Sequence, residues 1–294
     1  MRILYVGCVD SSYRELQILL ENGKNVVGVI TKESSSVNSD FCDISELAIE
    51  YGVPFLYVRN INDTESVSFI QKCNPDIIYC FGWSQIIKNE ILSIPPMGVI
   101  GAHPAELPNN RGRHPIIWAL VLGLNQTAAT FFKMDENADT GDIVSQEIVP
   151  IYYEDYAMDL YKRIENTECE MILKFTEDLE HNKVCLIKQD LTEGNSWRKR
   201  NQEDGLIDWR MSSRAIYNLV RALSRPYPGA EFLYQEESYK VWRVEEIMTD
   251  EYANIEPGKV VRVNNDHDFI VKSYDNLIHV VECSPIDIRE GEYL

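Results

Sequence analysis

Residues 1–30 read MRILYVGCVDSSYRELQILLENGKNVVGVI and indicate how the first half of the chain folds. Ile3–Val6 is a short apolar run, which is typical of a buried strand. Ser12–Glu15 matches the capping-box pattern and predicts the start of a helix that ends at Gly23. Val26–Ile30 is a second apolar run and predicts the next strand. A strand, a helix and a strand in this order form a βαβ unit, in which the two strands run parallel.

The same alternation continues towards residue 81. A helix capped by Asp43 or Ser45 precedes the short strand Pro54–Tyr57. A further helix follows Asp63, and Asp76–Phe81 predicts the next buried strand. We therefore expect an α/β fold with a Rossmann-like, mostly parallel sheet and flanking helices. Ligands of such sheets bind beyond the carboxyl ends of the strands.

Beyond residue 98 the order of elements changes. We expect a short strand, a helix opened by a proline, two β segments that extend the sheet like a hairpin, and a long helix. These elements are predicted at Val99–Ala102, Ile116–Leu122, Thr127–Met134, Ile143–Ile151 and residues 155–179.

The last third of the chain begins with a polar segment, Gly194–Gly205, which is the best candidate for a linker. An amphipathic helix capped by Ser212 or Ser213 follows it, and short β segments then predict a small β-barrel or sheet. The predicted domains are an N-terminal α/β domain (1–193), a linker with a helix (194–230) and a smaller β-rich C-terminal domain (231–294).

The chain is strongly acidic. It carries 47 acidic and 28 basic residues, a formal net charge of −19, whereas nucleic-acid-binding proteins normally present a basic face. Hydrophobic residues make up 45% of the chain, enough for a sizeable core. The apolar run before Asp10 is too short for a signal peptide and no apolar stretch approaches 18 residues, so we expect a cytoplasmic protein without membrane contact.

The motifs for common cofactors are missing from the sequence. The first strand is not followed by G-x-G-x-x-G, and no P-loop pattern occurs, which disfavours dinucleotide binding and P-loop chemistry. The seven cysteines lack the spacing of zinc ligands, so we expect reduced thiols and no metal. Residues 101–115, GAHPAELPNNRGRHP, instead concentrate His, Asn and Arg directly after a predicted strand, where α/β proteins place ligands.

A set of motifs in this region resembles the N10-formyltetrahydrofolate-dependent formyltransferases. It comprises His103–Pro108, Arg111–Gly112, Met134–Asp135 and Ala138–Ile143, in that order. The family includes methionyl-tRNA formyltransferase, glycinamide ribonucleotide formyltransferase and the nucleotide-sugar N-formyltransferases. Further similar segments extend the resemblance over roughly residues 1–235.

The resemblance implies transfer of a formyl group from the co-substrate N10-formyltetrahydrofolate to an amine. His103 occupies the position of the family's histidine, which can relay the amine proton or stabilise the oxyanion. Asp139 occupies the position of the aspartate that orients this imidazole, although an Asx-turn would also explain an aspartate there.

Gly101 departs from the family pattern, because an asparagine that donates to the oxyanion usually stands there. Loss of such a donor typically costs about 10²–10³ in rate unless another group replaces it. A protonated His103, a backbone N–H, a water, or a side chain of Asn109, Asn110 or Ser84 are the alternatives.

The resemblance also assigns binding residues. The pterin is expected beside the loop after the fourth strand and beside the turn before residue 143; for Trp83 an ordinary core position is the alternative. These folate-binding candidates are Phe81, Gly82, Trp83, Ser84, Gln85, Ile86, Asp139 and Asp142. The residues expected to bind the acceptor are Asn109, Asn110, Arg111 and Arg113. The guanidinium groups of the two arginines can bind phosphate through a planar fork.

The charge distinguishes between acceptors within the family. A nucleotide-linked amino sugar carries two phosphates, which one or two arginines can neutralise, whereas tRNA needs a basic face. Beyond the basic run Arg198–Arg200, the acidic chain offers little for tRNA. We therefore expect a nucleotide-sugar N-formyltransferase of surface-glycan biosynthesis, for lipopolysaccharide or O-antigen, with a homodimer as the candidate assembly. The alternatives are a methionyl-tRNA formyltransferase and a catalytically reduced folate or nucleotide-sugar binding protein.

Overall fold

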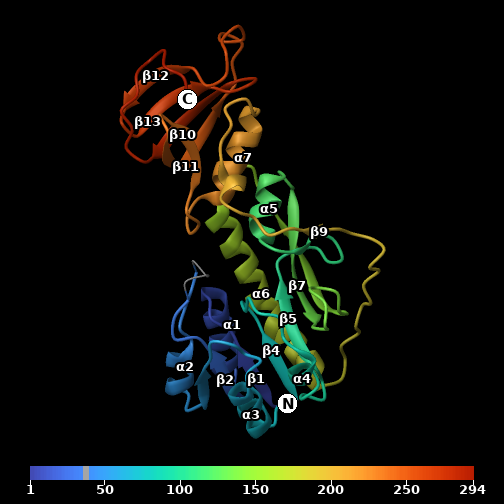
Figure 1. Cartoon of the computed structure of the whole chain (residues 1–294). Helices are drawn as coiled ribbons and strands as arrows, with labels where there is room; N and C mark the ends of the chain where they lie inside the picture. The colour runs from blue at the N-terminus through green and yellow to red at the C-terminus, as the bar shows by residue number, and fades with distance from the viewer. Residues whose placement is uncertain (36–39) are drawn as a thin grey trace. The chain divides into compact units, whose positions relative to one another are not determined.

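The computed structural model describes residues 1–35 and 40–294, and Figure 1 shows the course of the chain. The chain divides into two compact units. The first comprises Met1–Pro115, Thr127–Pro150 and Lys162–Trp197; the second comprises Ile116–Gln126, Ile151–Tyr161 and Arg198–Leu294. The predicted boundaries at residues 194 and 231 stay predictions.

A seven-stranded sheet forms the centre of the first unit. Its strand order is β3-β2-β1-β4-β5-β7-β8. The strands from β3 to β5 pair in parallel, and β5 pairs with β7 antiparallel. The bounds are Ile3–Val6 (β1), Val26–Thr31 (β2), Phe55–Tyr57 (β3), Ile77–Cys80 (β4), Val99–His103 (β5), Gln126–Lys133 (β7) and Ile143–Pro150 (β8). The predicted Rossmann-like, mostly parallel sheet is confirmed.

Helices cover both faces of this sheet because buried side chains alternate along its strands. Tyr5 and Tyr79 are register partners on one face; Tyr5 donates to Glu15 of α1, and the Tyr79 hydroxyl is bonded to Thr176 of α6. Their neighbours Leu4, Val6, Ile78 and Cys80 pack on the other face with residues of α3 and α4. The helices of the first unit are α1 (Asp10–Glu21), α2 (Ser45–Glu50), α3 (Thr64–Cys73), α4 (Asn89–Leu92) and most of α6 (Ala157–Glu180), whereas nearly all of α5 (Pro115–Val121) belongs to the second unit.

The predicted capping box at the start of α1 is wrong. The helix begins at Asp10, with Val9 as its N-cap and no side-chain cap. Ser12 lies inside the helix, where its hydroxyl donates to the Phe81 carbonyl, and Glu15 is buried against Tyr5. Both side chains are therefore used for packing α1 onto the sheet, a tertiary contact that the local pattern does not show.

The second unit contains an antiparallel sheet with the strand order β10-β11-β14-β13-β12. Its strands are β10 (Ala230–Tyr234), β11 (Glu237–Ile247), β12 (Val260–Asn265), β13 (Asp268–Lys272) and β14 (Leu277–Cys283). Between the two predicted alternatives, a barrel and a sheet, the strand order describes a sheet. Within the described parts of the chain, the helices are all too short or too polar to cross a membrane.

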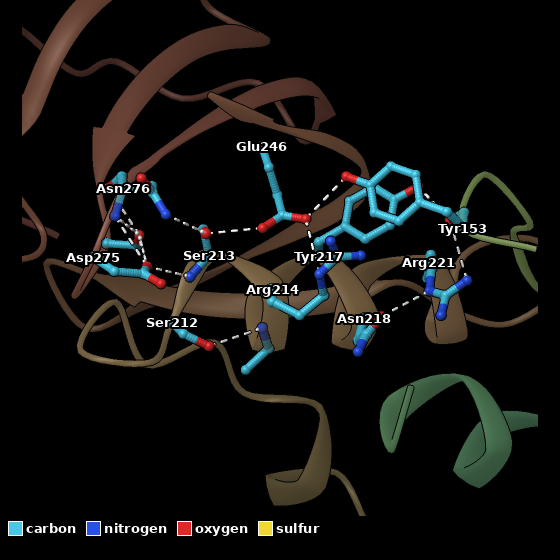
Figure 2. A network of polar contacts seen from close by, with 12 residues as sticks. Tyr153, Ser212, Ser213, Arg214, Tyr217, Asn218, Arg221, Glu246, Asp275 and Asn276 are labelled. Carbon is cyan, nitrogen blue, oxygen red and sulfur yellow. Dashed lines mark hydrogen bonds and ion pairs between the residues drawn. The ribbon is translucent and has the colours of Figure 1, made fainter. Parts of the chain in front are cut away.

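Helix α7 (Ser213–Leu223) packs on β11 of this sheet and is fixed there by a polar network (Figure 2). Ser212 caps the helix by accepting from the Ala215 amide, as predicted. The buried carboxylate of Glu246 accepts hydrogen bonds from Ser213 and Tyr153 and pairs with Arg214. One buried anion thereby joins the helix, the sheet and the segment before α6.

Candidate active site

His103 is the last residue of β5 and is 5% exposed. Its Nε2 lies 2.9 Å from the Asn110 carbonyl oxygen. Because a carbonyl only accepts, Nε2 is the donor of this bond, and in the neutral tautomer that fits it Nδ1 carries the lone pair. Nδ1 lies 3.7 Å from Oδ2 of Asp139. A proton taken up at Nδ1 would therefore lie beside a carboxylate.

Asp139 lies in the turn between β7 and β8 with a left-handed backbone, φ +60°. Its Oδ2 accepts a 2.9 Å hydrogen bond from the Gly112 amide. The Asx-type role in this turn belongs to Asp135, whose Oδ1 accepts from the Asn137 amide and the Thr140 hydroxyl. The Asp139 carboxylate is thus directed at the loop of residues 109–113, rather than at its own turn.

The turn needs a glycine two residues after Asp139. A Cβ on Gly141 would lie 1.7 Å from the Lys133 carbonyl oxygen, closer than any side chain can approach. The Lys133 amide in turn donates to the Asp142 carbonyl across the hairpin. This close approach explains why a glycine stands at position 141.

The loop after His103 is held by a strand that sequence analysis missed. β6 (Arg111–Gly112) pairs in parallel with β9 (Ser196–Trp197), and a Cβ on Gly112 would lie 2.3 Å from the Trp197 carbonyl oxygen. The Asn110 amide donates to Oδ1 of Asn195. The predicted linker segment thus begins with residues that bind the site loop; its polar composition is equally typical of a connection, so no sequence signal separated the two.

The loop Phe81–Ile86 is divided between core and surface. Phe81 lies in the aromatic core with Tyr79 and Phe131, and its backbone is engaged too: its amide donates to the Val6 carbonyl and its carbonyl accepts from the Ser12 hydroxyl. Trp83 packs against the core cluster on one side, and Lys32 Nζ lies 4.8 Å from its ring centroid. Trp83 thus takes part in core packing, and its role as a pocket wall stays a prediction.

The remaining residues predicted to bind folate differ in exposure and in whether their hydrogen-bonding groups already have partners within the protein. Gln85 is engaged, since its carbonyl accepts from the Ile61 amide and its NH₂ donates to the Arg59 carbonyl. Ser84 and Ile86 are exposed. Nε1 of Trp83 is buried and has no hydrogen-bond partner among the described residues. Gln85, Lys32 and Arg59 also border a cavity of about 390 Å³.

Two models of known protein families match most of the chain. The model described as formyl transferase matches residues 14–176, and the one described as formyl transferase, C-terminal domain, matches residues 199–290. The chain belongs to the formyltransferase family. The predicted resemblance and the expected enzyme class are therefore confirmed.

This formyltransferase is 30% identical over 302 residues to the methionyl-tRNA formyltransferase of Caldanaerobacter subterraneus subsp. tengcongensis, covering 100% of this chain and 96% of the relative. It is 31% identical over 268 residues to the bifunctional polymyxin resistance protein ArnA of Wigglesworthia glossinidia brevipalpis, covering 90% of this chain and 40% of ArnA. In fold it is similar to the N-formyltransferase of Helicobacter canadensis, solved in complex with folinic acid and dTDP-3-aminofucose. That match has a TM-score of 0.72 and 16% identity, covering 96% and 99% of the two chains.

Gly101 has an apolar surrounding in this formyltransferase. It is the register partner of Phe132 on β7, and a Cβ at this position would lie 3.0 Å from Phe132 Cζ and from Met134 Cγ. Phe132 belongs to a small buried cluster with Leu107 and Ile143. The space beside Gly101 is thus filled by hydrocarbon, which argues against a water there, because a buried water needs polar partners.

The candidate residues for the acceptor differ in burial. Asn109 and Arg113 are exposed. Nη1 of Arg111 is buried and has no hydrogen-bond partner within the described residues. A buried guanidinium nitrogen without an acceptor is costly unless a ligand supplies one. Arg111 is therefore the arginine of this loop that best fits a phosphate or carbonyl oxygen of a substrate.

Across residues 1–35 and 40–294, no group of three or more His, Cys, Asp or Glu side chains is arranged to hold a metal ion. Burial also raises the pKa of Cys8, which follows β1, to about 11, which disfavours a thiolate nucleophile at this sheet edge.

Proposed function

We propose that this formyltransferase transfers the formyl group of N10-formyltetrahydrofolate to the amino group of a nucleotide-linked amino sugar. Family membership supports the formyl transfer. The choice of acceptor rests on one observation about the basic run Arg198–Arg200. Arg198 forms an ion pair with Asp204, and Arg200 is buried with its guanidinium 4.6 Å from the Trp118 ring centroid.

These contacts give both arginines of the run partners within the protein, while Lys199 and much of the Arg198 side chain are exposed. Asp204 binds Arg198 through both of its carboxylate oxygens, and Arg200 donates to the Asp204 backbone carbonyl. Releasing these arginines to a nucleic acid would break the ion pair and unpack a buried side chain. In a chain of net charge −19, a diphosphate sugar contacted by Arg111 is the more favourable acceptor.

The folate, when bound, would supply the formyl group, and the buried Nε1 of Trp83 fits a ligand that offers a hydrogen-bond acceptor. When the amine nitrogen bonds to the formyl carbon, the bond from that carbon to N10 of the folate would break, so that overall the amine loses one proton and N10 gains one. Nδ1 of His103 carries the lone pair that can take this proton, since Nε2–H is donated to the Asn110 carbonyl. Asp139 then lies beside the imidazolium and favours it electrostatically.

The test is direct. The protein is incubated with N10-formyltetrahydrofolate and dTDP-, UDP- and GDP-linked amino sugars, while tetrahydrofolate release and the mass of the sugar product are followed. We expect turnover with at least one sugar. His103→Ala serves as the control that separates catalysis from spontaneous deformylation. The cytoplasmic location and a role in surface-glycan synthesis remain part of this proposal.

A second candidate is favoured by sequence identity, because a relative that aligns over the whole chain is a methionyl-tRNA formyltransferase. Formylation of methionyl-tRNA with no turnover of any sugar would replace our acceptor by tRNA. Tight folate binding without turnover, unchanged in His103→Ala, would instead indicate a binding protein that has lost catalysis, consistent with the apolar surrounding of Gly101.

A further inference from the structure

A segment without helix follows α6 and leads to β9 (Figure 1), with a turn over residues 191–194. Residues 187–197, which we term the strap, belong to the first unit. At one end of the strap, Ile187 exchanges two backbone hydrogen bonds with Ile143 at the start of β8. At the other end, Asn195 accepts from the Asn110 amide and β9 pairs with β6. The strap therefore contacts both loops that face His103.

Gln189 is the buried side chain of the strap, 5% exposed. Its NH₂ group donates to the backbone carbonyls of Asp139, at 3.0 Å, and Gly141, at 2.6 Å. Two carbonyl acceptors fix which end of the amide carries the nitrogen. The Gln189 carbonyl oxygen is buried and has no partner among the described residues. Gln189 therefore stabilises the structure through the two hydrogen bonds that its NH₂ group donates.

The turn at Asp139 needs such support. Asp139 has a left-handed backbone conformation. Residues other than glycine are uncommon in this conformation, and contacts with the surrounding structure help to hold them there. The position of its carboxylate relative to the Gly112 amide and to His103 Nδ1 depends on this backbone. A side chain that holds the carbonyls of residues 139 and 141 consequently sets the direction of the carboxylate.

We propose that Gln189 is a positioning residue, which holds the Asp139 carboxylate against the Gly112 amide and beside His103. The catalytic part of this inference rests on the proposed function; the structural part does not. Gln189 lies 50 residues after Asp139, near the end of the predicted N-terminal domain and just before the predicted linker Gly194–Gly205. It acts through Asp139 and is not assigned any contact with substrate.

Hydrogen exchange at the Gly112 amide tests the structural part without any substrate. In Gln189→Ala, and in the nearly isosteric Gln189→Glu, we expect this amide to exchange about tenfold faster or more, the loss typical of a hydrogen bond to a charged group. The Arg113 amide, which donates to Trp197, is the internal reference and should keep its protection. Unchanged protection of Gly112, or equal loss at both amides, would overturn the proposal.

Gln146→Ala is the matched control. Gln146 is a half-buried glutamine of β8 whose NH₂ group donates to the Leu107 carbonyl and the Thr130 hydroxyl, and neither of these acceptors belongs to the Asp139 turn. Its truncation removes a comparable side chain and should leave Gly112 exchange at the wild-type rate. Faster Gly112 exchange in this control as well would show a general loosening of the unit and would count against Gln189.

A double-mutant cycle of kcat/KM tests the catalytic part. Gln189→Ala is expected to lower kcat/KM about tenfold, and Asp139→Ala more strongly. If Gln189 acts through Asp139, the double variant should be no slower than Asp139→Ala. Fully multiplicative losses would refute the positioning role. If the wild type formylates no acceptor, the proposed function fails, and Gly112 exchange alone decides the role of Gln189.

Discussion

Gly101→Asn restores the residue that the family usually carries, and we expect it to harm this protein. The Cβ of any side chain at position 101 would lie 3.0 Å from Phe132 Cζ and from Met134 Cγ. Such a distance is below ordinary van der Waals contact, so both neighbours must move. Phe132 is 3% exposed and packed with Leu107, which leaves it little freedom. The cost falls on a close-packed cluster.

The magnitude follows from overpacking. Extra atoms forced into a packed core typically cost about 1–3 kcal/mol, and the amide of asparagine would also be desolvated against hydrocarbon. We expect Gly101→Asn to lose about 2–4 kcal/mol of unfolding free energy and Gly101→Ala about half of this. Turnover by Gly101→Asn should fall, because β5 also carries His103.

Urea unfolding and tetrahydrofolate release measure the two effects in the same samples. Gly101→Asn/Met134→Ala is the informative combination, since Met134 is half-buried and its truncation opens space on one side of residue 101. The double variant should recover part of the lost stability. Gly101→Asn with wild-type stability, or with clearly higher turnover, would refute the view that Phe132 and Met134 occupy the position of the amide.

Three further predictions concern other parts of the molecule. His103→Ala should lower turnover about 10²-fold or more while the fold is retained, as checked by circular dichroism; a rate near wild type would remove the imidazole from the mechanism. Burial first, and the charge of Glu165 second, raise the pKa of Glu168 on α6 to about 8, against an ordinary value of 4.5. The folded state therefore binds this proton more tightly than the unfolded state, and stability falls as pH rises from about 4.5 to about 8. Glu168→Gln should remove that loss, so its stability gain over wild type in urea melts should be larger at pH 8 than at pH 5; an equal gain at both pH values would contradict the assignment. Glu246→Ala should cost about 2–4 kcal/mol in urea unfolding, because it leaves the Ser213 and Tyr153 hydroxyls and Arg214 without their buried anion; Glu246→Gln should cost less, and equal losses would show that its charge is unimportant.

The sheet could be predicted because its signals are local. Apolar runs of four to six residues separated by helical segments identify β1, β2 and β4, and parallel pairing follows from the connections. The caps at Asp63 and Ser212 were predictable for the same reason, as each side chain bonds to an amide three residues later. Ser12 failed this test because Phe81, 69 residues away, competes for its hydroxyl.

The site was predictable only in part. The motif of residues 103–108 and the Asp139 turn are recognisable in sequence, and the structure brings His103 to 3.7 Å from Asp139. Gln189 and Asn195 carry no such signal, since a polar segment that binds a loop has the same composition as one that connects domains. The apolar surrounding of Gly101 depends on the register of β5 with β7, which the sequence does not state.

The sequence by itself determined the family, the parallel sheet and the two residues at which we expect chemistry, because these depend on local patterns and on motif order. Only the tertiary structure decided what surrounds those residues. It determines which ring nitrogen of His103 donates a hydrogen bond, which side chains fill the space beside Gly101, and which segment contacts the Asp139 turn. Each of these depends on contacts between residues far apart in the chain, formed by hydrogen bonds and close packing that arise only when the strands pair.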